Sequence, residues 1–375
     1  HPDGEQTPMT SPKFRRGRCW AAAGAALWLL AACGPVPGNP ARRQPAAAPR
    51  VWDQSDPAVL VAGTTTYLYG SSNNKKLPVR KVTTFRGSLS ASQSDWAANA
   101  RDAMPTRPGW INPGNAGIWA PSVIKIGSRY WAYFAGHRAG ATDRSNDQCI
   151  GRASATSPMG PFSPESSPIY CGLTKERGSN SWGRGALDPE VIRGSDNKLY
   201  LLVALSRTKA NIGALKLNTA GTVVGGTNAK PTTLVSQSAP WHDGVDDKAM
   251  TSKAFLENPS MVYEPKSRTY LLFYSAGEWY SARYNTGFAR CSSPVGPCSP
   301  DLAGPMLVSS STRTGPGGLT AFRDASGVLR AGYATWQKGY ESPRSNPDGK
   351  YSRHLSWATI KVSGSSPQTQ VVSLG

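Results

Sequence analysis

A short segment recurs along the chain, and this recurrence limits the possible folds more than any other feature of the sequence. Each copy has a proline, a small or acidic residue, an apolar pair, a turn and an aromatic-rich strand. Successive prolines are 64, 68 and 70 residues apart, a period that indicates a repeat architecture. The copies read "DPAVLVAGTTTYLYG", "APSVIKIGSRYWAYFAG", "DPEVIRGSDNKLYLL" and "NPSMVYEPKSRTYLLFY", with prolines at Pro57, Pro121, Pro189 and Pro259.

A fifth, degenerate copy runs from Gly318 to Trp336, with Leu319 in place of the proline. Between the copies, short apolar runs alternate with Gly, Pro, Ser and Asn, and no segment after residue 50 has a long apolar period of 3.6 residues. Five units of roughly 65 residues, each long enough for four strands, predict an all-β chain folded as a five-bladed β-propeller. A set of β-sandwich domains is the alternative, but it gives no reason for x-Pro to recur at blade spacing.

Three acidic residues share the register of the x-Pro pairs. Pro is tolerated at the first residue of a strand, so the preceding residue is expected at the channel mouth. Asp56 and Asp188 hold that position in the first and third units, and Glu257 lies one residue further back in "LENPSMV". Taken singly, each Asp-Pro pair is typical of a turn or of the start of a strand. Together they predict three carboxylates at one opening, where burial and repulsion separate pKa values as acid/base catalysis requires.

The motifs of the chain resemble those of glycoside hydrolase family 43, in the family's order, over about residues 50 to 362. This resemblance implies a five-bladed propeller enzyme that removes arabinofuranosyl or xylosyl units with inversion. It implies that Asp56 is the general base, Glu257 the general acid and Asp188 the carboxylate that orients and tunes the acid. The motifs are "SDPAV", "GIWAPSV", "CIGRASATSPMGPFSP", "ALDPEVI", "LENPSMV", "YNTGFARCSSPVGPC" and "TGPGGLTAF".

An inverting glycosidase needs one ionised carboxylate to activate water and one protonated carboxylic acid to protonate the leaving oxygen. Glu257 must therefore have a raised pKa, and we expect an ionised Asp188 beside it to raise that pKa by repulsion. Trp119 is expected at the channel mouth, packed against a sugar ring, with a core or inter-blade position as the alternative. His242 in "APWHDGVDD" is a second candidate for substrate contact, with a loop or surface role as its alternative.

One departure from the family pattern concerns a metal site. Many arabinan-cleaving members carry a histidine in Gly-Pro-Gly-His at the fifth blade, linked to a bound metal or to a water network. Here the segment reads "GPGG", from Gly315 to Gly318, so a calcium site cannot be carried over. The histidines have no metal-ligand spacing, and we expect neither a metal nor a cofactor. They are His1, His137, His242 and His354.

A basic stretch precedes a short apolar run near the start of the chain. The residues of 13–18 are rich in Lys and Arg, and "AAAGAALWLLAAC" follows, too short to cross a bilayer. The order predicts a lipoprotein-type signal peptide over residues 1–33, with Met9 as the expected translation start. Its end "LAAC" resembles a bacterial lipobox, which implies that Cys33 becomes the lipidated first residue of the mature chain.

The region after the predicted leader divides into a tether and a catalytic part. Residues 34–50 are rich in Pro, Ala and Arg and are expected to form a disordered tether. Residues 51–375 are expected to form the catalytic propeller. We therefore expect an exported protein, either secreted or attached by lipid to the extracellular face of the cell membrane, and a monomer.

Four cysteines remain once Cys19 leaves with the leader and Cys33 carries lipid. Three pairings are possible, and local closure within one blade favours two bonds that an exported location permits. The expected pairs are Cys149 with Cys171 and Cys291 with Cys298.

Charge says less about partners. The formal net charge is +19, from 42 Lys and Arg against 23 Asp and Glu, which raises a nucleic-acid hypothesis. We reject that hypothesis because the basic residues are dispersed and no recognition motif is present. Attraction to anionic envelope polymers, or to acidic pectin near arabinan, is the interpretation we favour.

Two classes of function therefore remain. The first is a glycosidase that cleaves arabinofuranosyl linkages in arabinan or a related polysaccharide, with β-xylosidase activity as its nearest variant. The second is a carbohydrate-binding propeller without turnover. The three acids favour the enzyme, and the motifs from "ENPSMV" to "YNTGFARCSSPVGPC" resemble the arabinose-directed side of the family. Loops over 101–117 and 211–244 decide between exo and endo cleavage, which the sequence leaves open.

Overall fold

The computed structural model describes residues 54–72, 75–85, 100–140, 148–172, 185–206, 211–243, 255–341, 353–364 and 371–374. The predicted leader, its Cys33 and the tether lie outside these residues. The described residues form strands and short 3-10 helices, with no α-helix among them. No helix in the described ranges is long and apolar enough to span a membrane.

The strands of the described residues form five groups of four, in chain order. The first group is β1 (Ala58–Ala62), β2 (Thr65–Tyr69), β3 (Pro78–Val82) and β4 (Arg101–Asp102). The second is β5 (Trp119–Ile126), β6 (Arg129–His137), β7 (Gln148–Ala155) and β8 (Ser163–Pro164). The third is β9 (Gly185–Arg193), β10 (Leu199–Ser206), β11 (Asn211–Leu217) and β12 (Thr232–Ser236). The fourth is β13 (Leu256–Glu264), β14 (Thr269–Ala276), β15 (Asn285–Cys291) and β16 (Cys298–Pro300). The fifth is β17 (Thr314–Arg323), β18 (Leu329–Trp336), β19 (His354–Ser363) and β20 (Val371–Leu374).

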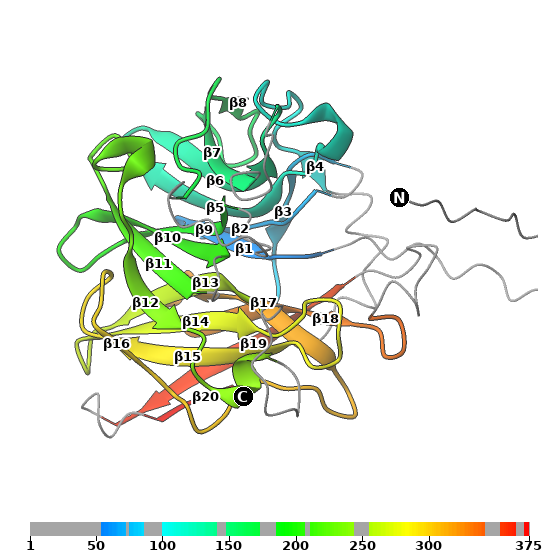
Figure 1. Cartoon of the computed structure of the whole chain (residues 1–375), viewed down its shortest axis with the longest axis vertical. Helices are drawn as coiled ribbons and strands as arrows, with labels where there is room; N and C mark the ends of the chain where they lie inside the picture. The colour runs from blue at the N-terminus through cyan, green and yellow to red at the C-terminus, as the bar shows by residue number, and fades with distance from the viewer. Residues whose placement is uncertain are drawn as a thin grey trace, which may run out of the picture. The chain divides into compact units, whose positions relative to one another are not determined.

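Each group is an antiparallel sheet in which sequence neighbours pair. The order is β1-β2-β3-β4 in the first sheet, β13-β14-β15-β16 in the fourth and β17-β18-β19-β20 in the fifth. The second and third groups join through a single parallel pair, Gln148 of β7 with Gly185 of β9. Figure 1 follows the groups from blue through cyan, green and yellow to orange-red. The predicted all-β, five-bladed propeller is confirmed.

The first strands of the blades contact one another in a cycle. Contacts run from β1 to β5, then to β9, β13 and β17, and from β17 back to β1. The chain near residue 54 also joins the fifth blade, because the Gln54 N–H donates to the Arg353 carbonyl at 3.1 Å. The start of each repeat unit therefore lies at the centre of the molecule, where the x-Pro register predicts it.

The second strands of the blades explain the apolar runs of the sequence. β14 reads "TYLLFYSA" and is buried at every residue, and β10 reads "LYLLVALS". A strand covered on both faces by neighbouring blades has no solvent side, so its apolar run is continuous rather than alternating. Tyr133, Leu201 and Phe273 are fully buried in the clusters between blades. Each such side chain contributes roughly 1.5 to 3 kcal/mol of burial free energy.

Within the described part of the chain, two disulfides close loops inside or next to single blades. Cys149 of β7 bonds Cys171, which follows β8, and Cys291 of β15 bonds Cys298 of β16. Both predicted pairs are confirmed. The first holds the segment after β8 against β7, just before the chain passes to the third blade.

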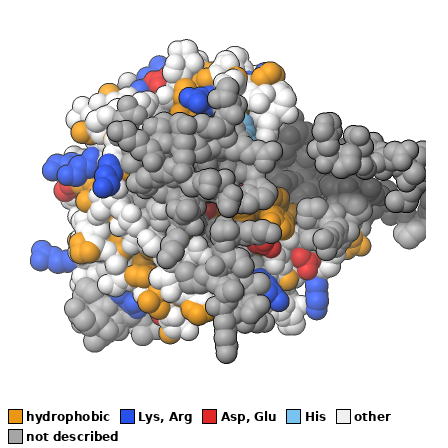
Figure 2. Space-filling model, viewed as in Figure 1, with side chains coloured by type: hydrophobic (Ala, Val, Ile, Leu, Met, Phe, Trp, Pro, Cys, Tyr) orange, Lys and Arg blue, Asp and Glu red, His pale blue; other side chains and the backbone are white. Residues whose placement is uncertain are grey.

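The basic side chains of the described residues are spread out rather than gathered on the face shown in Figure 2. On the face shown in Figure 2, the Lys and Arg side chains of the described residues lie in separate places around the edge. This distribution agrees with the dispersed basic residues of the sequence, and the absence of a nucleic-acid partner stays a prediction.

Candidate active site

The residue before the proline of each repeat unit, or before Leu319 in the fifth, has the same unusual backbone. All five have positive φ, which is uncommon outside glycine and persists only where surrounding structure holds it. The inner strands of blades two to five also change register with their neighbours near this point, as β-bulges do when they redirect a side chain. The five are Asp56 at 48°, Ala120 at 44°, Asp188 at 50°, Asn258 at 48° and Gly318 at 61°.

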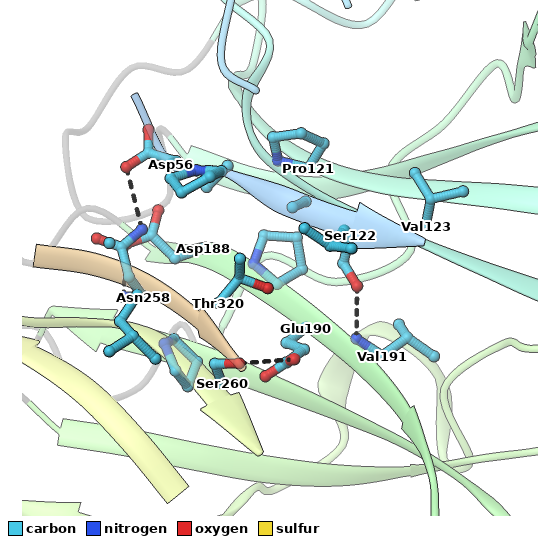
Figure 3. A pocket seen from close by; sticks show the side chains of 18 residues that line it. Asp56, Pro121, Ser122, Val123, Asp188, Glu190, Val191, Asn258, Ser260 and Thr320 are labelled. Atoms are coloured by element: carbon cyan, nitrogen blue, oxygen red, sulfur yellow. Dashed lines mark hydrogen bonds between the residues drawn. The ribbon is translucent and has the colours of Figure 1, made fainter. Parts of the chain in front are cut away.

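These five residues, which we call the ring, line one end of the central channel. The channel has a volume of about 90 Å³ and is lined by the ring together with the three residues that follow in most blades. Asp56, Asp188 and Asn258 also line a larger cavity of about 370 Å³ beyond the ring. The ring thus separates cavity from channel, and Figure 3 shows these three side chains turned toward one another.

Asp56 is held by three partners. The Ser71 hydroxyl donates to its Oδ2, the Asn258 Nδ2 donates to its Oδ1 at 3.2 Å, and a guanidinium nitrogen of Arg353 lies 3.6 Å from the same Oδ1. Its side chain is 14% exposed and Arg353 is 9% exposed, so this ion pair is screened by little water. The contacts stabilise negative charge and fix the carboxylate at the cavity floor.

Asp188, on the third blade, lies beside Asp56 and is buried. Its Oδ2 accepts a hydrogen bond from the Asn258 N–H at 3.0 Å. Burial raises the pKa of Asp188 well above its ordinary value, and the charges of Glu257 and Asp56 raise it further. Three carboxyl groups this close cannot all be ionised at low cost, so at least one proton is held among them.

Glu257 precedes the ring residue of the fourth blade and faces the cavity. It is buried, and the Tyr284 hydroxyl lies 2.7 Å from its Oε1. Burial raises the pKa of Glu257 to about 7, with the charge of Asp56 adding to the rise. The sequence predicts a raised pKa for Glu257 as the general acid. Burial is the main cause of this rise, whereas the prediction from the sequence is repulsion by Asp188.

Aromatic rings stand at the cavity with the acids. Trp119 lines the cavity as the sequence predicts, and its ring meets His137 edge-on with centroids 4.7 Å apart. Trp279 also lines the cavity and is 39% exposed. Its ring stacks on Trp336, and the Arg353 guanidinium lies 5.5 Å from its centroid. The floor therefore carries charge, while the walls offer flat apolar faces of the kind that bind sugar rings.

His242 is not among the residues that line the cavity. It is fully buried, and its Nδ1 accepts from the backbone N–H groups of Ser238 and Ala239 at 3.1 and 3.3 Å. Its Nε2 lies 3.2 Å from the Tyr274 hydroxyl, and burial lowers its pKa to about 4. The structure therefore places His242 in the packing of a loop against the fourth blade, and not at the predicted substrate contact.

Another carboxyl group, on the partly buried Glu190, lies in the channel two residues beyond the ring. Its Oε1 accepts from the Ser260 hydroxyl at 3.1 Å and its Oε2 from the Met261 N–H at 2.8 Å. Burial raises the pKa of Glu190 to about 8. Ser122 and Ser260 occupy the same position in their blades and accept from the next strand, at Val191 and Ala321. Figure 3 shows the Ser122–Val191 and Ser260–Glu190 bonds, which join neighbouring innermost strands.

Several site residues were missed in the sequence. Asn258 stands at the ring position of its blade, so the register that marks Asp56 and Asp188 also marks Asn258. Tyr284, Arg353 and Trp279 lie outside the recurring x-Pro segment. Tyr284 opens the motif "YNTGFARCSSPVGPC", whereas Arg353 and Trp279 carry no local signal. Within the described residues, no group of three His, Cys, Asp or Glu side chains could hold a metal ion.

Solved structures with similar folds include three carbohydrate-active enzymes. A thermostable family-43 glycoside hydrolase has 18% sequence identity, covers 85% of this chain and 92% of its own, and gives a TM-score of 0.64. The α-L-arabinofuranosidase of Lactobacillus brevis has 17% identity, coverages of 86% and 95%, and a TM-score of 0.61. An endo-1,4-β-xylanase of Bacteroides thetaiotaomicron has 17% identity, coverages of 87% and 95%, and a TM-score of 0.60.

At these identities the solved structures establish the fold alone. No curated protein matches the chain. The model of glycosyl hydrolases family 43 matches residues 51–353, a range that contains all five ring residues and all three acids. The chain therefore belongs to glycosyl hydrolases family 43.

Proposed function

We propose that this glycoside hydrolase is an exported, inverting enzyme that cleaves arabinofuranosyl linkages in arabinan or an arabinose-containing polysaccharide. One observation carries the proposal. Carboxyl groups from the first, third and fourth blades meet at the floor of one cavity, and they have different partners. Asp56 faces a guanidinium, while Glu257 is buried with a pKa of about 7.

The two groups fit the two proton transfers of inversion. Asp56, with its charge stabilised by Arg353, takes a proton from the attacking water. Glu257 gives its proton to the glycosidic oxygen, so the leaving group departs as a neutral alcohol. Asp56 and Glu257 are linked through Asn258 and Tyr284 rather than by direct contact, which leaves the space between them for sugar and water. Asp188 adds a carboxyl group beside both.

The cavity supports an arabinose-containing substrate. Trp119 and Trp279 offer ring faces to a furanose and to the sugar next to it. An α-L-arabinofuranosidase is among the enzymes of similar fold. The xylanase of similar fold favours one second candidate, a β-xylosidase that uses the same acids.

A substrate panel tests the proposal. Nitrophenyl α-L-arabinofuranoside, nitrophenyl β-D-xyloside, linear arabinan and xylo-oligosaccharides are compared, with products separated by chromatography. We expect arabinose or short arabino-oligosaccharides to be released well above the rate of xylose release. Xylose as the dominant product would replace arabinan by xylan as the substrate, and no release from any member of the panel would overturn the proposed activity.

The cellular location is part of the proposal. The basic leader and "LAAC" support acylation of Cys33, which would anchor the enzyme at the outer face of the cell membrane. Intact-mass analysis of protein extracted from membranes should show a mature chain that begins with a diacylglyceryl cysteine. A soluble secreted chain cleaved at another residue would contradict this.

A further inference from the structure

Asn258 joins the three carboxyl groups of the site into one network. Its Nδ2 donates to Asp56 Oδ1 at 3.2 Å, and its backbone N–H donates to Asp188 Oδ2 at 3.0 Å. Its Oδ1 lies 2.8 Å from the Tyr284 hydroxyl, and the same hydroxyl lies 2.7 Å from Glu257 Oε1. Figure 3 shows the Asn258 amide directed at Asp56. The Asn258 side chain thus contacts the proposed base, Asp56, and the Tyr284 hydroxyl connects Asn258 to the proposed acid, Glu257.

Asp56 sets the direction of these hydrogen bonds. A carboxylate only accepts, so the NH₂ group of Asn258 must point at Asp56 and its carbonyl oxygen at Tyr284. That oxygen also only accepts, so Tyr284 must direct its single hydroxyl proton at Asn258. Glu257 then faces the lone pairs of the Tyr284 oxygen.

Glu257 makes a hydrogen bond to this oxygen only when it is protonated. Two oxygens 2.7 Å apart need a proton between them, and the proton of Tyr284 is already directed elsewhere. Protonated Glu257 supplies it. Ser275 does not interfere, because its hydroxyl accepts from the Gly318 N–H at 2.8 Å and is left to donate to the Tyr284 oxygen.

The charges that face Glu257 come from three other blades. Asp56 lies before β1 and favours the protonated acid, whereas Arg353, just before β19, favours the carboxylate. Asp188 on β9 faces the same group, and the charge of Glu257 raises the pKa of Asp188. Burial is the largest influence and raises the pKa of Glu257 to about 7. A hydrogen bond donated by the Tyr284 hydroxyl lowers this pKa. Asn258 Oδ1 competes with Glu257 for the same hydroxyl proton.

We propose that Asn258 and Tyr284 are positioning residues that keep a proton on Glu257 until the leaving group takes it. The proposal rests on the proposed role of Glu257 as general acid. When Glu257 gives its proton to the glycosidic oxygen, the Tyr284 hydroxyl rotates and donates to the new carboxylate, and its bond to Asn258 breaks. A proton taken up from water by Glu257 restores the first arrangement, so the charge of Asp56 is linked to the protonation of Glu257.

The test removes the amide and then the hydroxyl. Asn258→Gly suits the positive φ of 48° and frees Tyr284 to donate to Glu257, so we expect the basic limb of kcat/KM to move down by about one pH unit. In the double variant Asn258→Gly with Tyr284→Phe, no hydroxyl remains, and the limb should return to that of Tyr284→Phe alone. Ala120→Gly is the matched control, because it adds a glycine to the ring without removing an amide.

A second readout needs no turnover. In protein labelled with carboxyl-¹³C glutamate, the Glu257 resonance is assigned by its loss in Glu257→Gln, and its titration is followed by NMR. The same downward shift in Asn258→Gly, and its disappearance in the double variant, support the proposal even if no tested glycoside is a substrate. An unchanged or raised Glu257 pKa in Asn258→Gly overturns it. An equal drop in the single and double variants also does so, because Tyr284 would then not transmit the effect.

Discussion

Glu190 and Glu257 lie on neighbouring innermost strands, β9 and β13, the first partly buried and the second buried. Burial raises the pKa of both, to about 8 and about 7. Their surroundings differ. Glu190 lines the narrow channel below the ring and accepts from a serine hydroxyl and a backbone N–H of the next blade. Glu257 lines the large cavity above the ring, beside two other carboxyl groups. A raised pKa therefore does not by itself identify an acid catalyst, whereas access to the cavity and a nearby base do.

The largest expected effect is the difference in activity between a variant at the cavity, Asp56→Ala, and a variant in the channel, Glu190→Gln. Asp56→Ala should lower kcat on arabinan by on the order of 10⁴-fold, because Asp56 is the group proposed to activate water. Glu190→Gln should stay within about threefold of the wild type, since its amide can keep one acceptor for the Met261 N–H and one donor for the Ser260 hydroxyl. Initial rates at saturating arabinan check both variants. Comparable losses in the two would erase the distinction between cavity and channel.

The second prediction concerns the acid alone. Glu257→Gln should reduce the rate on arabinan by about 10²- to 10³-fold and the rate on nitrophenyl arabinofuranoside much less, because nitrophenolate leaves without a proton. The measurement is kcat/KM for a series of aryl arabinofuranosides plotted against leaving-group pKa. A loss of the same size for every leaving group would remove Glu257 from the acid role.

The sequence predicts the positions of the three acids, but only part of the difference between Glu190 and Glu257. The x-Pro period places Asp56 and Asp188 in one ring, and the same register places Glu257 one residue before it, because a repeat fixes equivalent positions whatever the tertiary details. The period also marks Glu190, as the acidic residue after Pro189, but the sequence does not say that it lies below the ring.

The other residues around the acids come from connections between strands. Tyr284 comes from the connection between β14 and β15, Trp279 from the same connection, and Arg353 from just before β19. None of them belongs to the recurring segment, so the repeat period does not link them to the acids. His242 shows the opposite error, because a polar loop sequence suggested a site residue and the folded loop buries the ring.

The third prediction uses stability rather than activity. The pKa of Glu190 is about 8 in the folded chain against 4.5 for an ordinary glutamate, so the unfolded chain loses this proton first as pH rises. The stabilisation is complete below pH 4.5 and is lost as pH rises toward 8. Glu190→Gln should remove that part of the dependence. Denaturant unfolding of both proteins at pH 5 and pH 8 measures the difference, and parallel pH dependences would show that Glu190 is ionised in the fold.

The smallest expected effect lies at the cavity wall. Trp279→Ala should raise KM for arabino-oligosaccharides by roughly fivefold, about 1 kcal/mol of lost apolar contact, with little change in kcat. Trp131→Ala is not a suitable control, because its ring packs on Arg152 at 4.2 Å. The exposed Val224→Ala, away from the residues that line the cavity, serves instead. A fall in kcat with unchanged KM would place Trp279 among the groups that position the acids.

The stereochemistry of the first product tests the central claim most directly. Proton NMR during hydrolysis of an α-L-arabinofuranoside observes the anomer before mutarotation. The account predicts that β-L-arabinofuranose forms first, because Asp56 directs water to the face opposite the leaving group that Glu257 protonates. Initial formation of the α anomer would contradict it, since retention requires a carboxylate that attacks the sugar instead of a base that activates water.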